Sequence, residues 1–349
     1  MIRKTDRTID TTSSTVVTVG DVRFGADPMP VVAGPCTVES EAQIKHLAEV
    51  VSAAGGRMLR GNAVATLSSG PYGFQGLGLD GVRMLSEAGR SVGLPVVTQI
   101  AEPREALAVS ELVDMLEISS GNMQNFELLR AVGQTGLPVM LKRGPSATFD
   151  EWLWAAEYVL AEGNDQVVLC ERGIRAFERT DTLDIAAVPA VKEKSHLPVV
   201  VFPSHAVSDR HSVGPLALAA QGVGADGLVV EVHPDPDKAA MNPIGQLDPA
   251  GFDGLMAALG INRLRGQVDL IDRDIVRLLA RRRQLTAAIG RVKAVRGMPI
   301  YVPAREEELL EVIREEARMQ GVDEGYVTSL FELVLANSRA AQRRERGEE

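Results

Sequence analysis

The chain has 349 residues, 45% of them hydrophobic, and carries a formal net charge of −10 at pH 7. This length is large for a single hydrophobic core and suits a barrel-sized domain followed by a smaller one. The acidic total argues against broad nucleic-acid binding, and no apolar run approaches the length of a membrane span, so neither a nucleic acid nor a membrane is expected as a partner.

The cysteine content and the N-terminal residues indicate a cytoplasmic protein. Cys36 and Cys170 are the two cysteines of the chain, too few for a disulfide framework. Residues 1–14 are polar and lack the apolar core of a signal peptide, so we expect them to be flexible.

A change in charge divides the chain near Gly260. Residues 1–259 carry 20 Lys+Arg against 32 Asp+Glu, whereas residues 260–349 carry 17 against 15. The hydrophobic pattern changes at the same place. We therefore expect residues 15–259 and 260–349 to form separate domains.

Short apolar segments alternate with helix-length segments over the first domain. Residues 16–19 and 22–24 flank a Gly20-Asp21 turn and predict a β-hairpin. Eight further strands are predicted at residues 31–34, 57–61, 95–99, 114–119, 138–142, 166–170, 198–202 and 226–231. This alternation implies parallel pairing and favours an α/β fold closed into a (β/α)8 barrel. An open doubly wound sheet is the alternative, but no G-x-G-x-x-G follows the first of these strands.

The C-terminal ends of the predicted strands carry polar side chains, and barrel enzymes place their chemistry at that end. Cys36, His205 and Glu231 form a sulfur, nitrogen and oxygen donor set for a borderline divalent metal. Alternatively, Cys36 is a small buried hydrophobic residue and His205 a hydrogen-bonded turn residue. Basic residues at the strand ends predict a phosphate or carboxylate site, formed by Arg60, Lys142, Arg143 and Arg172.

A long amphipathic helix is predicted over residues 261–296. Its apolar stripe comprises Leu264, Val268, Ile271, Ile275, Leu278, Leu285, Ile289 and Val292. Arg282 and Lys293 lie inside that stripe, within roughly 20° of each other around the helix. Because burying an unpaired cation costs several kcal/mol, an anionic ligand is expected against them. Alternatively, both side chains reach the surface or pair with glutamates.

Two shorter helices, over residues 303–319 and 323–344, follow a Gly297-Met298-Pro299 break. Arg305 and Glu306 open the first of them. On the second, polar and apolar side chains share an arc of roughly 60°, namely Phe331, Leu335, Ser338 and Gln342. This pattern predicts either a coiled-coil partner surface or an enclosed polar pocket.

Residues 15–259 contain, in this order, the motifs AGPCTVES, LRGNA, GPYGFQGLG, QNFELL, LKRG, LCERGIRAFE, PSH and VEVHPDPDKA. Together they resemble the barrel of type Iβ 3-deoxy-7-phosphoheptulonate (DAHP) synthases, which 3-deoxy-octulosonate 8-phosphate synthases share. The resemblance implies condensation of phosphoenolpyruvate with erythrose 4-phosphate in aromatic amino-acid biosynthesis. It also implies a divalent metal cofactor, Mn²⁺ or a similar ion, bound by Cys36, His205 and Glu231.

The chain departs from this family at several charged positions. The family's fourth metal ligand, an aspartate, is Asn242 here, and a phosphate-binding arginine is Gly121. A Lys-Pro-Arg-Thr segment is replaced by residues 65–68, another arginine by Thr180, and the acid before the PSH motif by Phe202. Charge-assisted contacts contribute ~1.5–3 kcal/mol each. We therefore expect that the barrel has lost DAHP synthesis and serves as a scaffold or regulatory body.

The helical segment contains L-R-x-x-V-D-x-I-D, L-L-A-R-R, a lysine, R-E and S-x-x-x-Q in order, over residues 261–345. This pattern resembles the all-helical chorismate mutases. Val302 replaces a position that is often aspartate in that family. The resemblance implies a pocket for chorismate or prephenate lined by Arg282, Lys293, Arg305, Glu306, Ser338 and Gln342, with Arg265 contributed by a partner chain.

These residue types suit the rearrangement of chorismate to prephenate, which is intramolecular and needs no cofactor. Arginines can fork onto the two carboxylates of chorismate. The resemblance implies that Lys293 and Gln342 hydrogen-bond its ether oxygen and that a protonated Glu306 orients Gln342. Three short helices cannot enclose such a pocket alone, so a homodimer or higher homo-oligomer through the helical domain is expected.

Three functions follow from these observations. The first expectation is a chorismate mutase that carries a catalytically silent barrel. The alternative is a bifunctional DAHP synthase and chorismate mutase. A second alternative is a DAHP synthase whose helical domain senses chorismate or prephenate.

Overall fold

The computed structural model describes residues 3–6, 15–64, 70, 72–176 and 181–346. The chain divides into two compact units, Met1–Ile261 and Asn262–Glu349. Among the described residues, no helix combines the length and the apolar character that a membrane crossing requires.

The first unit is a closed barrel of parallel strands, which confirms the predicted fold. Neighbouring strands follow the order β10-β3-β4-β5-β6-β7-β8-β9. The strands are β3 (Val31–Gly34), β4 (Met58–Arg60), β5 (Val96–Ile100), β6 (Met115–Ile118), β7 (Val139–Lys142), β8 (Val167–Glu171), β9 (Val199–Val201) and β10 (Gly227–Glu231). All residues of these strands are buried, because helices cover the outside of the barrel and side chains fill the inside.

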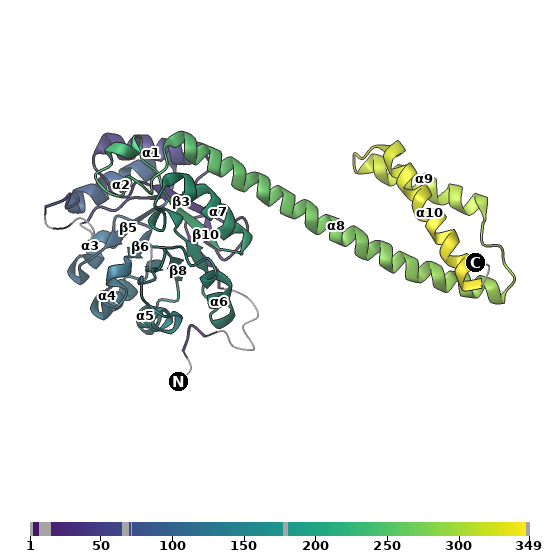
Figure 1. Cartoon of the computed structure of the whole chain (residues 1–349), viewed down its shortest axis with the longest axis horizontal. Coiled ribbons are helices and arrows are strands. Elements are labelled where there is room, and N and C mark those ends of the chain that lie inside the picture. The colour runs from purple at the N-terminus through teal and green to yellow at the C-terminus, as the bar shows by residue number, and fades with distance from the viewer. Residues whose placement is uncertain (1–2, 7–14, 65–69, 71, 177–180, 347–349) are drawn as a thin grey trace. The chain divides into compact units, whose positions relative to one another are not determined.

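Helices surround the barrel in Figure 1, which shows the labelled strands at the centre of this unit. They are α1 (Glu41–Ala53), α2 (Gly78–Val92), α3 (Ala106–Ser110), α4 (Phe126–Gln134), α5 (Phe149–Ala161), α6 (Ala187–Lys194) and α7 (Val213–Gly222). Side-chain caps fix three of these helix starts: Ser40 accepts from the backbone N–H of Gln43, Asn125 accepts from that of Leu128, and Thr148 forms a capping box with Glu151.

The predicted N-terminal hairpin is confirmed and closes one end of the barrel. Strands β1 (Val17–Val19) and β2 (Val22–Phe24) pair antiparallel. Their buried side chains join the inner barrel residues in one hydrophobic cluster. Gly227 begins β10 so close to Phe24 that an added Cβ would lie 3.0 Å from the phenyl ring. The hairpin therefore packs against the N-terminal ends of the strands and leaves the C-terminal ends for the site.

Three helices follow the last strand: α8 (Pro249–Val295), α9 (Pro303–Met319) and α10 (Glu324–Arg346). Helix α8 begins well before Ile261, where the sequence pattern predicts the helix to start. It also continues through Gly260, because a single glycine costs only about 1 kcal/mol in a helix interior and no proline interrupts this segment. In the second unit, α9 and α10 pack against each other.

Candidate active sites

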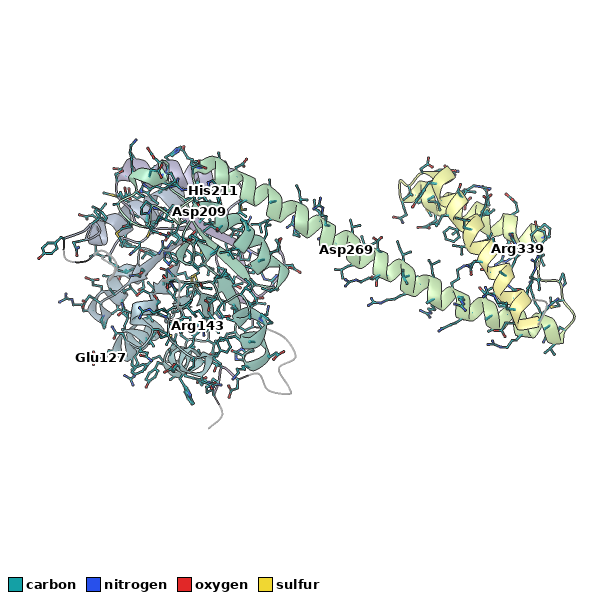
Figure 2. All side chains as sticks on the ribbon, in the orientation of Figure 1. Glu127, Arg143, Asp209, His211, Asp269 and Arg339 are labelled. Carbon is teal, nitrogen blue, oxygen red and sulfur yellow. The ribbon has the colours of Figure 1, made fainter. Side chains whose placement is uncertain are left out.

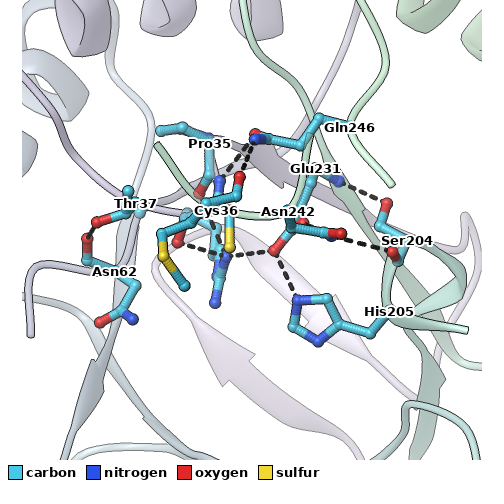
Figure 3. Close-up of polar contacts among 12 residues, drawn as sticks. Pro35, Cys36, Thr37, Asn62, Ser204, His205, Glu231, Asn242 and Gln246 are labelled. Atoms are coloured by element: carbon cyan, nitrogen blue, oxygen red, sulfur yellow. Dashed lines mark hydrogen bonds and ion pairs between the residues drawn. The ribbon is translucent and has the colours of Figure 1, made fainter. Parts of the chain in front are cut away.

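Three side chains that the sequence predicts as metal ligands meet at the C-terminal end of the barrel. Cys36 follows β3, His205 ends the short η4 helix (Pro203–His205) after β9, and Glu231 is the last residue of β10. Because β9, β10 and β3 are neighbours, their ends lie together. One potential ligand atom of each residue lies within 4.8 Å of the other two. Figure 3 shows Cys36, His205 and Glu231 around one point.

A close approach of two strand ends places Cys36. Gly34 has φ 149°, and an added Cβ would lie 1.9 Å from the carbonyl oxygen of Arg60. Only glycine permits this approach. The Arg60 guanidinium donates to the carbonyl oxygens of Pro35 and Cys36, each at 3.2 Å. The backbone of Cys36 is thereby held beside the barrel interior.

The protonation states of the three residues follow from their burial and neighbours. Burial raises the pKa of the Cys36 thiol well above its ordinary value, and the nearby Glu231 carboxylate raises it further. Burial also lowers the pKa of His205, despite its hydrogen bond to Glu231. Although burial opposes it, the pKa of Glu231 lies far below its ordinary value because His205 and Arg60 stabilise the carboxylate. A neutral imidazole and a carboxylate are the forms that bind a metal.

The donor chemistry therefore fits a divalent metal ion. Thiol, imidazole and carboxylate donors together suit a borderline ion, and metal binding releases the thiol proton. Asn242 lies beside these donors, and its Nδ2 donates to Glu231 Oε2 at 2.6 Å. The cluster supplies the donor set that the resemblance to DAHP synthases implies.

Buried cations surround Glu117, an acid that the sequence reasoning missed. Arg60 bridges Glu117 and Glu231 at 3.0 and 2.9 Å, and Lys142 Nζ lies 2.7 Å from Glu117. Burial raises the pKa of Glu117, but Arg60 and Lys142 outweigh burial and hold it at about 2. A lone acid within the apolar run of a predicted buried strand could have revealed this ion pair.

The other two predicted cations also lie at strand ends. Arg143 pairs with Glu171 at 3.0 Å and with Asp184 at 2.9 Å. Arg172 pairs with Asp181 at 3.2 Å, but its Nε is buried without a hydrogen-bond partner in the part of the chain that the structure describes. An unsatisfied buried guanidinium N–H is a suitable donor to an anion.

Phe202 occupies the position where the family carries an acid. Its ring stacks on the His205 imidazole, with ring centroids 4.1 Å apart. Lys142 Nζ lies 4.3 Å from the centre of the same ring. The phenyl ring therefore supports both a candidate ligand and a buried cation through stacking and a cation–π contact.

The second unit brings two of the predicted mutase residues, Arg282 and Ser338, into contact. Arg282 on α8 donates to Ser338 on α10, and burial lowers the pKa of Arg282. Lys293 donates to the carbonyl oxygen of Ile300 at 2.9 Å. Gln342 is 7% exposed, and its Oε1 has no hydrogen-bond partner among the described residues. Both cations of the apolar stripe thus point toward polar groups of their own unit.

Other predicted residues do not join this group. Arg265 is exposed, and Arg305 is 71% exposed and pairs with Glu308. Glu306 forms an ion pair with Arg339, although the sequence predicts a contact with Gln342. Figure 2 labels Arg339 in the helical unit.

A cavity of about 610 Å³ lies between α9 and α10 and is bordered by Glu306 and Arg339. Arg339 also lies 5.3 Å from the centre of the Tyr301 ring. Arg339 could not be predicted from the sequence, because a charged residue near the end of a helix carries no signal that separates it from a surface residue.

The apolar stripe of α8 is exposed in the single chain. Its predicted members Leu264, Val268, Ile271, Ile275, Leu278, Leu285, Ile289 and Val292 are 47% to 64% exposed. Contiguous exposed apolar surface of this kind marks an interaction site rather than an ordinary helix face.

A closed parallel barrel with such a cluster, followed by a helical unit with a polar pocket, defines a two-domain enzyme. The chain belongs to the DAHP synthetase I family, whose model matches residues 7–259. The model of chorismate mutase type II matches residues 264–343, so the C-terminal helices are a chorismate mutase domain. Such a domain implies binding of chorismate or prephenate.

Relatives of known activity resemble the barrel part of the chain. A phospho-2-dehydro-3-deoxyheptonate aldolase of Thermotoga maritima is 44% identical over 236 residues, 67% of this chain and 70% of the relative. A crystal structure of a DAHP synthase from that organism superimposes with a TM-score of 0.71 at 39% identity, covering 76% of this chain and 77% of the other. A 2-dehydro-3-deoxyphosphooctonate aldolase of Magnetococcus marinus is 30% identical, over 71% of this chain and 93% of the relative.

These findings overturn the expectation of a catalytically silent barrel. The Cys36, His205 and Glu231 cluster is intact, and the barrel is 44% identical to the Thermotoga enzyme. The expectation was based on the number of substituted cations. The buried cations beside the cluster, Arg60 and Lys142, are nevertheless present and share the acid Glu117. Of the substituted positions, residues 65–68 and Thr180 lie outside the described residues, and Gly121 lies in η3 (Ser120–Asn122).

Proposed function

We propose that this chain is a bifunctional enzyme of aromatic amino-acid biosynthesis. The barrel condenses phosphoenolpyruvate with erythrose 4-phosphate to DAHP, and the helical domain rearranges chorismate to prephenate. The observation that carries the barrel half is the intact cluster of Cys36, His205 and Glu231, with buried cations beside it.

In the barrel, the chain's own residues bind and orient two anionic substrates. Arg60 and Lys142 are buried beside the cluster and are suited to hold a carboxylate or phosphate of phosphoenolpyruvate. Arg172 offers its unsatisfied Nε to a second anionic group. A bound divalent ion, Mn²⁺ or a similar one, supplies Lewis acidity toward the aldehyde oxygen of the sugar phosphate. Holding both substrates in one orientation accounts for much of the rate enhancement of such a condensation.

In the helical domain, Arg282, Lys293 and Gln342 would hold chorismate in its reactive conformation, and none of the three lines the cavity bordered by Glu306 and Arg339. Arg282 is suited to fork onto one carboxylate, since its present partner is the small Ser338 hydroxyl. Lys293 and Gln342 are suited to hydrogen-bond the ether oxygen, because charge develops there in the transition state. Gln342 would donate to the ether oxygen through its Nε2, whereas its unsatisfied Oε1 can accept a hydrogen bond only from a donor such as a ligand hydroxyl.

A second copy of the chain completes this pocket. Arg265 and Arg282 lie on the same continuous helix α8, and a rise of 1.5 Å per residue separates them by roughly 25 Å. Arg265 therefore reaches a pocket that contains Arg282 only from another chain. The exposed apolar stripe of α8 gives that second copy a surface to cover.

Two assays on the purified full-length chain test the proposal. One supplies chorismate and measures prephenate, and the other supplies phosphoenolpyruvate and erythrose 4-phosphate with Mn²⁺, Zn²⁺ or Co²⁺ in parallel samples and measures DAHP. We expect both products. Prephenate without DAHP contradicts the barrel half, and DAHP without prephenate contradicts the mutase half.

A further inference from the structure

The side-chain amide of Asn242 touches the candidate metal cluster from the loop after β10. Its Nδ2 donates one hydrogen to Glu231 Oε2 at 2.6 Å and the other to the carbonyl oxygen of Ser204 at 3.1 Å. Figure 3 shows Asn242 between these two groups. Asn242 has φ 47°, the left-handed region that asparagine adopts more readily than most residues. The amide thus joins the end of β10 to η4.

The orientation of this amide is fixed by its acceptors. Turning the amide over would place Oδ1 against the carboxylate of Glu231 and the carbonyl of Ser204, and both of these groups only accept hydrogen bonds. The loop itself is also held, because Gln246 accepts from the backbone N–H of Cys36 at 3.0 Å and donates to the carbonyl of Met241 at 2.8 Å. The oxygen of Asn242 therefore points away from Glu231.

We propose that Asn242 is a positioning residue for Glu231 and not a metal ligand. The ion is then held by three protein donors, a thiolate, an imidazole and one carboxylate. Such a set favours borderline ions such as Zn²⁺ or Co²⁺ over hard ions such as Mn²⁺, which prefer oxygen ligands. This inference rests on the proposed function only in taking the Cys36 cluster as the metal site.

The neutral side chain of Asn242 also affects the net charge of the site. A divalent ion is balanced by the Cys36 thiolate and the Glu231 carboxylate. Among the described residues, the ion pairs of Arg60 and Lys142 include one further acid, Glu117, so one positive charge remains for an anionic substrate. A carboxylate at position 242 would cancel that charge, whereas the neutral amide preserves it.

Metal binding by the full-length chain tests this inference without any measurement of DAHP. The chain is stripped of metal with a chelator, and the dissociation constants of Zn²⁺ and of Mn²⁺ are measured by competition with a coloured chelator. We expect Asn242→Asp to tighten Mn²⁺ binding by about tenfold or more, because it adds an oxygen ligand and a charge. Zn²⁺ binding should tighten by a smaller factor, so the preference for Zn²⁺ over Mn²⁺ falls.

Two further variants make the result decisive. Ile244→Asp adds a carboxylate to the same loop at a side chain that is 52% exposed, and it should leave both constants within about twofold of the wild type. Asn242→Ala should weaken both ions together, because Glu231 loses its positioning partner but the ion loses no donor. The absorption bands of bound Co²⁺ should keep the same wavelengths in Asn242→Ala and shift in Asn242→Asp.

Two results would overturn the proposal. One is a ratio of Zn²⁺ to Mn²⁺ affinity that is the same in Asn242→Asp and the wild type. The other is a selective loss of Mn²⁺ affinity in Asn242→Ala, which would make the amide oxygen a ligand. Because the readout is the affinity for metal, absence of DAHP synthesis would contradict the proposed barrel function and leave this result standing.

Discussion

Glu231 in the barrel and Arg305 in the helical unit are both candidate site residues, yet Glu231 is completely buried whereas 71% of the Arg305 side chain is exposed. The partners of Glu231 come from β4, from η4 and from the loop after β10, all in the same unit. Folding of one barrel therefore completes its site. The helical unit leaves Arg265 and an apolar stripe exposed, and for this reason we propose that a second copy of the chain completes its site.

The two sites therefore respond separately to substitution, and the largest effect is expected at Arg282. Arg282→Ala should lower the mutase kcat/KM by about 10³-fold, because a carboxylate of chorismate loses its charged partner. DAHP synthesis should be unchanged. Prephenate formation is followed by the loss of chorismate absorbance, with Arg281→Ala, an exposed neighbour, as the matched control. A fully active Arg282→Ala enzyme would show that the mutase site is assigned to the wrong residues.

Cys36 should show the opposite pattern. Cys36→Ala, or removal of metal with EDTA, should lower DAHP formation by about 10²-fold or more, because a lost Lewis acid costs several kcal/mol. Prephenate formation should be unaffected. Cys170→Ala is the control, since Cys170 is also a buried thiol but lies outside the cluster. Equal losses in the two cysteine variants would indicate damage to the barrel rather than loss of a metal ligand.

Acid should weaken the barrel through Glu117. Its pKa of about 2 in the folded chain lies below the ordinary 4.5, although burial alone would raise it. The unfolded chain therefore binds more protons between these values, and the stability contributed by Glu117 is present above pH 4.5 and is lost as pH falls toward 2. Urea unfolding of the barrel between pH 5 and pH 3 should show this decline in the free energy of unfolding. In Glu117→Gln the decline should be smaller, and an equal decline would contradict this origin.

Much of the fold could be predicted because parallel strands buried on both faces leave apolar runs such as residues 198–202. The metal cluster could be predicted because the carboxyl ends of neighbouring strands meet, which brings Cys36, His205 and Glu231 together. The start of α8 could not, because the pattern before Gly260 resembles a barrel helix and no residue interrupts it.

The orientation of polar side chains also could not be predicted from the sequence. The position of the Asn242 amide depends on two acceptors, Ser204 and Glu231, that come from different elements. Likewise, the ion pair between Glu306 and Arg339 depends on how α9 packs on α10. These contacts join residues that are far apart in the sequence, so their geometry depends on how the elements pack.

Mixing two inactive variants tests the contrast between the sites most directly, although its expected effect is the smallest. In a dimer that exchanges Arg265, each pocket uses Arg282 of one chain and Arg265 of the other. A mixture of Arg265→Ala and Arg282→Ala chains then forms heterodimers with one complete pocket. If exchange is random, half of the dimers are mixed, and prephenate formation should recover to about a quarter of the wild-type rate. DAHP synthesis should stay constant throughout, because the barrel site lies within one chain. Each variant exchanged with itself is the control, and a mixture with no recovery would mean that Arg265 does not serve the pocket of its partner.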